Sequence, residues 1–389
     1  MSALIVQPRA RIFHGHDWVY ATEVKNRVGD PQPGDVVTLK DVRGKPLGSA
    51  IYNPKSQIIA RRFSFRNQEL DLDFFTRRIQ RAVNHRAGLG INTFLSRLVW
   101  SESDGLPGLI VDRYGDHVVI QTLTLAMDLR KEIIIQAIIE VLKPVSIIER
   151  NEAAVRRAEG MELIKGVIYG APSAPAQIKH EGIVFHVDLL DGQKTGLYLD
   201  QLDNYQHVAK LAKGRTVLDC FTNQGGFAQA CALAGATRVV AVDVSESAIA
   251  TARSNAESSG TSIEFIAANC FDYLKEADSR RDRYDLIVLD PPSFTKTKQS
   301  VNDALRGYKE IHLRALKMLP AGGILSTFSC SHHISMMDFH QMIVDAAVDA
   351  KRTLRQVAVY GQRPDHPIIA GLPETEYLRG YAFEVMASW

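Results

Sequence analysis

Residues 216–329 alternate apolar runs that suit buried strands with runs that suit helices. The apolar runs read TVLDCF, RVVAVDV, IEFIAAN, YDLIVLD and GGILSTFS, and the first leads through a glycine loop into FAQACALAGA, which has helical periodicity. Strands separated by helices favour a parallel sheet with crossover helices on its faces. The pattern therefore predicts a doubly wound, Rossmann-like α/β domain.

Four polar residues lie near the ends of these runs: Asp219, Asp243, Asn269 and Asp290. In an open parallel sheet the ligand lies over the carboxyl ends of the strands, so these side chains are expected to line one crevice. Asp243 follows Asp219 by 24 residues, about the spacing at which such folds place a carboxylate for ribose hydroxyls. Each residue alone could be a turn or cap residue, but together they predict a nucleotide site.

The loop after the first run indicates which nucleotide binds. Asp219-x-Phe221-x-Asn223-x-Gly225-Gly226 lacks the GxGxxG pattern that wraps a pyrophosphate. S-adenosylmethionine has no pyrophosphate, and it needs close backbone approach and carboxylates that tolerate its cationic groups. We therefore predict S-adenosylmethionine as the cofactor rather than a dinucleotide. The residues expected to bind it here are Asp219, Phe221, Thr222, Asn223, Gly225, Gly226, Asp243, Val244, Ser245, Asn269, Cys270, Phe271 and Asp290.

Asp290 and Cys330 are the predicted catalytic residues. Asp290 opens the stretch Asp-Pro-Pro-Ser-Phe, whose prolines stiffen a turn that would hold a target base. Cys330 directly follows the fifth run, at the same expected edge, and a thiolate is well suited to add to C6 of a pyrimidine and so activate C5. The alternative for Cys330 is a small buried hydrophobic residue. Asp290 is either the base that removes the C5 proton or a group that holds the cytosine edge, whereas Cys220 and Cys231 are expected to pack in the core.

The N-terminal residues are basic. Residues 1–68 carry eleven Lys and Arg against five Asp and Glu, an excess that suits phosphate binding although a solvated surface gives the same count. Short β-like runs between residues 31 and 65 predict a small β-barrel, with Trp18 in its core. RNA is the expected partner, and the candidate RNA-binding residues are Arg9, Arg11, Arg61 and Arg62.

A connecting helix over residues 70–88 and a small α+β unit are expected between the barrel and the α/β domain. The helix has apolar spacing on one face and places Arg77, Arg78, Arg81 and Arg86 on the exposed face. The acidic stretch 101–105 is interpreted as a hairpin connection rather than a metal site. A Gly- and Pro-rich segment at 170–175 marks a boundary, so the predicted domains are 1–69, 70–176 and 177–389.

The cysteines show no CxxC pair, so no metal site is expected. The apolar runs are short and the first residues lack a secretory signal pattern, which favours a cytoplasmic protein without a membrane segment. The sequence leaves the oligomeric state open, with a homodimer as one alternative.

Together these motifs resemble those of the RlmI-type rRNA large-subunit cytosine-5 methyltransferases. The N-terminal stretches Gly15-His16-x-Trp18-Val19 and Pro33-Gly34-Asp35-Val36 are similar to the RNA-binding PUA domain of that family, and residues 103–114 are also family-like. Residues 193–201 resemble the segment that closes over the cofactor, which adds Tyr198, Asp200 and Gln201 as cofactor neighbours. The resemblance implies 5-methylcytosine formation in large-subunit rRNA through a covalent bond between Cys330 and C6.

The sequence departs from the family pattern at several positions. Leu202 and Tyr205 stand where the family usually has arginines, and Asn269 stands where an acid is common. Ser293 replaces the extra cysteine of the two-cysteine RNA cytosine methyltransferases, which agrees with a single-cysteine mechanism. Two alternatives stay open: methylation of another acceptor, such as another base, a protein or a metabolite, and a non-catalytic RNA-binding ribosome-assembly factor that retains the cofactor site.

Overall fold

The computed structural model describes residues 2–171, 176–192, 194–295 and 298–387. The chain forms two compact units. The first unit comprises Met1–Ala176, Val187–Leu199 and Pro364–Glu376, and the second comprises Gln177–His186, Asp200–Arg363 and Tyr377–Trp389. The expected boundary segment includes residues 172–175, which lie outside the described residues. The boundary between the units is not a single position near residue 177, because two segments that follow it in the sequence belong to the first unit.

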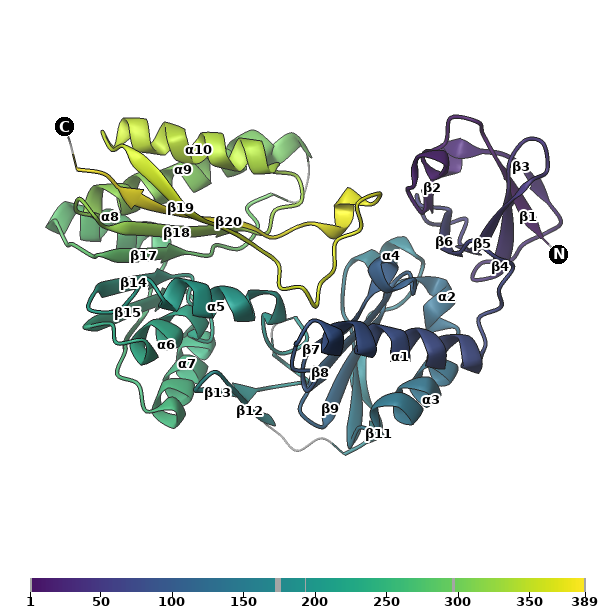
Figure 1. The fold of residues 1–389 in the computed structure, drawn as a ribbon, viewed down its shortest axis with the longest axis horizontal. Helices are drawn as coiled ribbons and strands as arrows, with labels where there is room; N and C mark the ends of the chain where they lie inside the picture. The colour runs from purple at the N-terminus through teal and green to yellow at the C-terminus, as the bar shows by residue number, and fades with distance from the viewer. Residues whose placement is uncertain (1, 172–175, 193, 296–297, 388–389) are drawn as a thin grey trace. The chain divides into compact units, whose positions relative to one another are not determined.

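The N-terminal part of the first unit is a six-stranded mixed sheet in the order β2-β6-β5-β4-β1-β3 (Figure 1). Its elements are β1 (Ala3–Val6), η1 (Arg11–His14), β2 (Trp18–Val19), η2 (Ala21–Glu23), β3 (Val24–Val28), β4 (Val36–Lys40), β5 (Pro46–Tyr52) and β6 (Ala60–Ser64). Leu4, Val19, Leu39 and Tyr52 form its core. The prediction that Trp18 fills this core is wrong: Trp18 is half-buried, and its Nε1 donates a hydrogen bond of 2.8 Å to Glu102 Oε1.

The central part of the first unit is a five-stranded sheet in the order β11-β10-β9-β8-β7. Its elements are α1 (Leu72–Gly88), β7 (Leu95–Trp100), η3 (Ser101–Asp104), β8 (Leu109–Tyr114), β9 (His117–Thr122), α2 (Leu125–Asp128), α3 (Lys131–Leu142), β10 (Ser146–Asn151), α4 (Val155–Ala158) and β11 (Ile164–Gly170). Helices α1 and α3 lie side by side and share an apolar core with the sheet (Figure 1). The η3 turn joins the antiparallel strands β7 and β8, as expected for a hairpin connection.

Arg86 corrects one expectation about α1, because its side chain is fully buried rather than exposed. Its guanidinium binds both carboxylate oxygens of Asp104, at 2.5 and 2.8 Å. It also donates to the backbone carbonyls of Arg97, at 3.0 Å, and Asp365, at 2.8 Å. Helical periodicity predicts only that Arg86 lies on the polar face of α1. It does not show that carboxylate and carbonyl groups from other elements cover this side chain.

Buried polar contacts hold the two later segments in the first unit. Thr195 Oγ1 donates a hydrogen bond of 2.6 Å to Asp112 Oδ2, and Asp112 also binds Arg97 through both oxygens, each at 2.7 Å. In the second segment, Asp365 Oδ2 accepts a hydrogen bond of 3.0 Å from the backbone amide of Arg97. Buried carboxylates need such partners, so both segments are fixed to β7 and β8.

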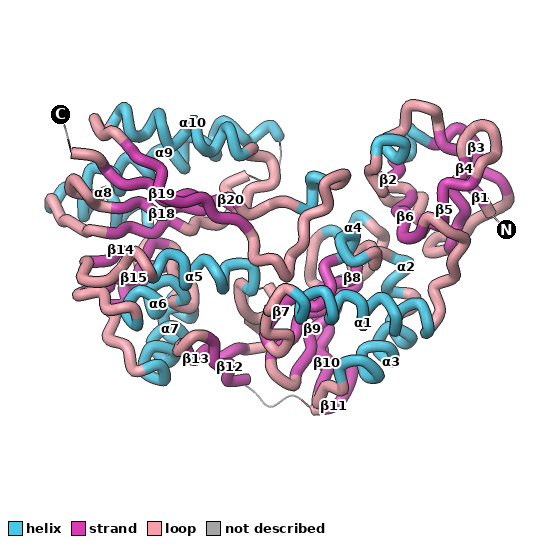
Figure 2. The backbone as a smooth tube through the Cα atoms, viewed as in Figure 1, coloured by secondary structure: helices cyan, strands magenta, loops and turns pink. Residues whose placement is uncertain are grey.

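The second unit is built on a seven-stranded sheet in the order β16-β15-β14-β17-β18-β20-β19. The first five strands are parallel, and β20 runs antiparallel between β18 and β19. Helices α5, α6 and α7 cover one face and α8, α9 and α10 the other (Figures 1 and 2). The doubly wound fold predicted from the strand pattern is therefore confirmed.

The elements of this half of the chain follow one another in the predicted alternation within residues 216–329. They are β12 (Ala176–His180), β13 (Ile183–Val187), η4 (Leu199–Gln201), α5 (Leu202–Ala209), β14 (Thr216–Cys220), α6 (Gly226–Leu233), β15 (Arg238–Asp243), α7 (Glu246–Ser259), β16 (Glu264–Ala267), α8 (Cys270–Arg280), β17 (Leu286–Leu289), η5 (Lys298–Ser300), α9 (Val301–Met318), β18 (Ile324–Ser329), α10 (Met336–Asp349), β19 (Leu354–Gly361), η6 (Pro373–Thr375) and β20 (Arg379–Val385). None of the described helices has both the length and the apolar character needed to cross a membrane.

Candidate active site

The carboxyl ends of four parallel strands bring the predicted site residues to one edge of the second unit. Asp219 lies near the end of β14 and Asp243 ends β15, while Asp290 follows β17 and Cys330 follows β18. Because these strands are parallel neighbours, their ends share one edge of the sheet. This is the edge at which doubly wound folds bind ligands.

The loop between β14 and α6 adopts a constrained backbone. Phe221, Asn223 and Gly225 all have left-handed φ angles, at 64°, 48° and 81°. Such angles are costly for Phe and Asn and occur mainly where the surroundings enforce them, often at functional sites. Gly226 has a different reason to be glycine, since an added Cβ would clash with the ring of Tyr205.

Asp219 is a buried carboxylate with one oxygen unsatisfied. Its Oδ2 accepts hydrogen bonds from Thr222 Oγ1 at 2.5 Å and from the Ala228 amide at 3.1 Å. Its Oδ1 has no hydrogen-bond partner among the described residues. Burial raises the pKa of Asp219 to about 7; the Thr222 hydrogen bond opposes this rise, and the carboxylate of Asp290 adds to it. A buried acceptor without a donor calls for a ligand donor, and a cationic amino group fits it well.

Asp243 accepts hydrogen bonds from two backbone amides, Asn223 to Oδ2 and Ser245 to Oδ1, both at 2.9 Å. A carboxylate oxygen has more than one acceptor site, so half-buried Asp243 keeps capacity for hydroxyl groups such as those of a ribose. Next to it, Val244 is exposed. Asn269 is also exposed and caps α8 by accepting a hydrogen bond of 2.9 Å from the Phe271 amide.

Cys270 is buried against this loop. The thiol is buried, and its sulfur accepts a hydrogen bond of 3.2 Å from the backbone amide of Phe221. The half-buried rings of Phe221, Phe271 and Phe294 gather nearby, with centroids 5.6 to 6.5 Å apart. These rings offer an apolar surface at the same edge, of the kind that packs against a purine or pyrimidine.

Cys330 is half-buried, whereas the other three cysteines, all described, are buried. A hydrogen bond with Cys270 and burial hold the pKa of Cys220 well above its usual value, and burial also raises the pKa of Cys231. Protonated, buried thiols are poor nucleophiles. Cys330 is therefore the cysteine that a reactant can reach.

The three residues predicted from the segment that closes over the cofactor belong to different units. Tyr198 belongs to the first unit, and the Lys194 ammonium lies 4.1 Å from its ring centroid. Asp200 and Gln201 belong to the second unit, where both are buried. Asp200 Oδ2 accepts a hydrogen bond of 2.6 Å from the hydroxyl of Tyr377.

The two positions that lack family arginines lie in the core of α5. Leu202 is fully buried, and Tyr205 packs edge-on against Phe227, with ring centroids 4.7 Å apart. Arg363 places a cation beside this helix, and its Nε donates a hydrogen bond of 3.0 Å to Asp203 Oδ1. Both positions therefore hold packed apolar or aromatic side chains in place of a charge.

The four arginines expected to contact RNA fall into two groups. Arg9 and Arg11 are exposed, and the Arg11 guanidinium lies over the ring of Tyr20 at 4.7 Å. Arg61 is paired with Glu102 at 2.6 Å and Arg62 with Asp17 at 2.7 Å, and both side chains are largely buried. Arg61 and Arg62 thus hold the first unit together, which narrows the predicted RNA-contacting set to Arg9 and Arg11.

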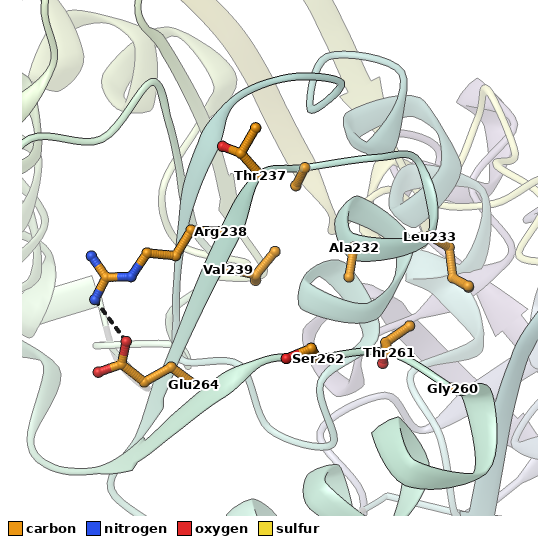
Figure 3. Close-up of a pocket in the computed structure, with 10 residues that line it drawn as sticks. Ala232, Leu233, Thr237, Arg238, Val239, Gly260, Thr261, Ser262 and Glu264 are labelled. Atoms are coloured by element: carbon orange, nitrogen blue, oxygen red, sulfur yellow. Dashed lines mark hydrogen bonds and ion pairs between the residues drawn. The ribbon is translucent and has the colours of Figure 1, made fainter.

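An open cavity of about 520 Å³ lies at the other end of the same sheet (Figure 3). It is lined by Arg238 and Glu264, which begin β15 and β16 and form an ion pair of 2.7 Å. The amino ends of the strands lie here, so this cavity is separate from the site residues. Among the described residues, no group of three or more His, Cys, Asp or Glu side chains is placed to hold a metal ion.

Sequence reasoning missed Tyr308, a fully buried residue of α9. Its hydroxyl lies 3.1 Å from Ser331 Oγ and 3.3 Å from Ser329 Oγ, the two residues that flank Cys330. On the sequence, Tyr308 occupies the apolar face of an amphipathic helix and reads as a core aromatic residue. A tyrosine in place of phenylalanine on a buried face is the one signal that could have indicated a polar partner.

Comparison with known proteins identifies two families along the chain. S-adenosylmethionine-dependent methyltransferases match residues 162–371, and PUA-like domains match residues 7–65. Ribosomal RNA large subunit methyltransferase I of Vibrio vulnificus is 38% identical, with 99% of this chain and 100% of that protein covered. The protein of the same name from Escherichia coli is 37% identical, with the same coverage.

Solved structures share the fold over the whole chain. An S-adenosylmethionine-dependent methyltransferase from Streptococcus mutans superposes with a TM-score of 0.85 at 21% identity, covering 99% of this chain and 100% of that one. A methyltransferase solved in complex with SAH gives a TM-score of 0.86 at 22% identity, with the same coverage. At this level of identity the likeness establishes the fold.

Proposed function

The chain belongs to the family of ribosomal RNA large subunit methyltransferase I, and from this premise we propose that it methylates C5 of a cytosine in large-subunit rRNA. It is an S-adenosylmethionine-dependent methyltransferase with a PUA-like domain. The observation that carries the proposal is the half-buried thiol of Cys330 at the strand edge it shares with Asp290. A thiol in that place serves carbon methylation of a pyrimidine, which requires a nucleophile to activate C5.

The cofactor-binding residues fit S-adenosylmethionine, which supplies a methyl group on a cationic sulfur. Asp219 Oδ1 would accept a hydrogen bond from its ammonium group, and Asp243 would accept from its ribose hydroxyls. The strained loop at Phe221 and Asn223 would bring backbone amides close to it. The rings of Phe221 and Phe271 offer apolar surface for its adenine.

The proposed role of Cys330 is nucleophilic. Its thiolate adds to C6 of the cytosine, so that a sulfur–carbon bond forms and the electron pair of the C5–C6 double bond becomes available at C5 for the new bond to the methyl carbon. The bond between that methyl carbon and the cofactor sulfur would break, and its electron pair would stay on the sulfur. A base then removes the proton from C5. The electron pair of the broken C5–H bond restores the double bond and expels the Cys330 thiolate, which regenerates the enzyme.

Asp290 is the proposed partner of Cys330, with one of two roles: removal of the C5 proton or binding of the cytosine edge. Asp290→Asn distinguishes them. If Asp290 is the base, the variant accumulates methylated RNA covalently bound through Cys330; if it holds the base, no adduct forms.

RNA contact is proposed for Arg9 and Arg11 in the PUA-like domain, with the target base turned out of its stack to reach Cys330. The relatives named above come from bacteria, in which rRNA is made in the cytoplasm, and we propose the same location for this enzyme. The direct test is incubation with labelled S-adenosylmethionine and unmodified large-subunit rRNA, followed by nucleoside mass spectrometry. We expect 5-methylcytidine. Another methylated nucleoside or labelled protein would indicate a different acceptor, and tight cofactor binding without transfer would indicate an assembly factor.

A further inference from the structure

Tyr308 links the two residues on either side of Cys330. Its hydroxyl lies 3.3 Å from Ser329 Oγ and 3.1 Å from Ser331 Oγ. All three of these side chains are buried, whereas Cys330 between them is half-buried. The hydroxyl of a residue on α9 thus binds the side chains on both sides of the nucleophile.

The hydrogen bonds continue from Ser331 into the turn that follows Asp290. Ser331 Oγ lies 2.9 Å from Ser293 Oγ, and Ser293 Oγ donates a hydrogen bond of 2.7 Å to the backbone carbonyl of Thr295. Four hydroxyl groups therefore connect the turn that carries Cys330 to the turn that carries Asp290.

The donor and acceptor of each hydrogen bond in this chain of hydroxyl groups follow from its last acceptor. A backbone carbonyl only accepts, so Ser293 uses its proton on Thr295 and accepts from Ser331. By the same reasoning Ser331 accepts from Tyr308, and Tyr308 accepts from Ser329. Every hydroxyl has one proton, and each proton is used within the chain. The chain is therefore suited to hold two turns in place rather than to supply protons to the reaction.

We propose that Tyr308 is a positioning residue, whose hydroxyl sets the spacing between Cys330 and Asp290 through Ser329, Ser331 and Ser293. The proposal rests on the nucleophilic role of Cys330 put forward above. Burial raises the pKa of Tyr308, so its hydroxyl stays protonated and available as a donor at neutral pH. The ring is held separately, by Phe294 at 4.5 Å and Phe339 at 5.8 Å between centroids.

Tyr308→Phe removes the hydroxyl and keeps these ring contacts. We expect the rate of methyl transfer to fall about ten- to hundredfold, because small displacements of reacting groups have effects of this size. The dissociation constant for S-adenosylmethionine should change little, whereas the melting temperature should fall by a few degrees, because the buried hydroxyls of Ser329 and Ser331 lose a hydrogen-bond partner. The matched control is Tyr273→Phe. It removes a hydroxyl that lies 3.0 Å from the hydroxyl of Tyr284 and takes no part in this series of hydrogen bonds, so the rate of methyl transfer should stay unchanged.

A double-mutant cycle tests whether the hydroxyls act as one chain. Tyr308 and Ser293 are joined only through Ser331 in this chain of hydrogen bonds. If the chain acts as a unit, combining Tyr308→Phe with Ser293→Ala gives a rate close to that of the slower single variant. Rates that multiply would show that the two residues act independently and would overturn the proposed linkage.

The rate at which iodoacetamide alkylates Cys330, followed by mass spectrometry of its peptide, separates this proposal from the proposed function. Alkylation needs no RNA, and we expect the rate in Tyr308→Phe to differ from that of the wild type. Wild-type turnover in Tyr308→Phe overturns the positioning role. If the wild-type enzyme forms no 5-methylcytidine, the proposed function fails, and an unchanged alkylation rate in Tyr308→Phe would then overturn the positioning role as well.

Discussion

The side-chain amide of Gln201 donates a hydrogen bond of 3.0 Å to Asp290 Oδ2. Gln201 is itself held by Asn204, whose Nδ2 donates to Gln201 Oε1 at 2.7 Å and to the Gly361 carbonyl at 2.9 Å. The start of α5 thereby orients the carboxylate that shares an edge with Cys330. A family-like segment that the sequence linked to the cofactor is thus also connected to the proposed catalytic residue.

Gln201→Met keeps the length of the side chain and removes its hydrogen bonds. We expect a fall of about tenfold or more in the methyl-transfer rate, because Asp290 loses the donor that orients it. Gln206→Met, in the adjoining helix α5, is the matched control, since the Gln206 Nε2 has no hydrogen-bond partner among the described residues. Steady-state rates of both variants check this, and equal rates would show that the Gln201 contact has no part in the reaction.

The pKa of Asp219, raised by burial to about 7, predicts a pH-dependent affinity for S-adenosylmethionine. Below pH 7 Asp219 is protonated, so a proton must leave before the carboxylate can pair with the cationic ligand. The dissociation constant should therefore fall as pH rises toward 7, by up to about tenfold per unit, and level off above it. Calorimetry between pH 5.5 and 8.5 measures this.

Asp219→Asn provides the control for that titration. The variant should bind more weakly, and any pH dependence that it keeps belongs to other groups or to the ligand. In the unliganded protein, the stability of the fold changes with pH in the opposite direction to the affinity. The folded state holds the Asp219 proton between the unfolded value near 4 and the folded value of about 7, so stability should decline as pH rises through that window. A wild-type affinity profile that matches Asp219→Asn would contradict the assignment.

Arg86→Met should destabilise the first unit by about 3–5 kcal/mol, because it leaves the largely buried carboxylate of Asp104 without its charge partner. The change also removes the hydrogen bond to the Asp365 carbonyl in the segment Pro364–Glu376. Hydrogen exchange of α1 in increasing urea measures the loss. Arg77→Met, which breaks only an exposed pair with Asp73, should cost about 0.5 kcal/mol or less, and equal losses in the two variants would contradict this account.

Much of the second unit could be predicted from the sequence, because its signals are local. Apolar runs that end in Asp219, Asp243 and Asp290 specify parallel strands, and parallel strands place their ends on one edge whatever the details of packing. Cys330 could be placed beside Asp290 for the same reason.

The remaining features depend on contacts between distant parts of the chain. Arg86 reads as exposed on a helical pattern, yet its partner Asp365 lies 279 residues away. Thr195 and Asp112 are 83 residues apart, and their contact assigns part of the C-terminal half to the first unit. The sequence around Tyr308 does not indicate which groups bind its hydroxyl. Side-chain hydrogen bonds of this kind depend on tertiary packing, which hydrophobic periodicity does not encode.

The RNA contacts proposed for Arg9 and Arg11 predict a change in salt dependence. Replacing both with Gln should weaken RNA binding and reduce the slope of log K against log salt by about 0.7 for each arginine that neutralises a phosphate on single-stranded RNA. Arg238→Gln is the control, since this exposed residue lies at the amino end of β15. Filter binding at several salt concentrations measures the slopes, and an unchanged slope in the double variant would place the RNA interface elsewhere.

The most direct test of the central claim is covalent trapping on RNA that contains 5-fluorocytidine. Fluorine at C5 cannot be removed as a proton, so the enzyme should remain bound through Cys330 after methyl transfer. We predict a denaturation-resistant RNA–protein adduct with the wild type and with Cys270→Ser, whose thiol is buried, and none with Cys330→Ser. An adduct or undiminished turnover in Cys330→Ser would contradict the mechanism.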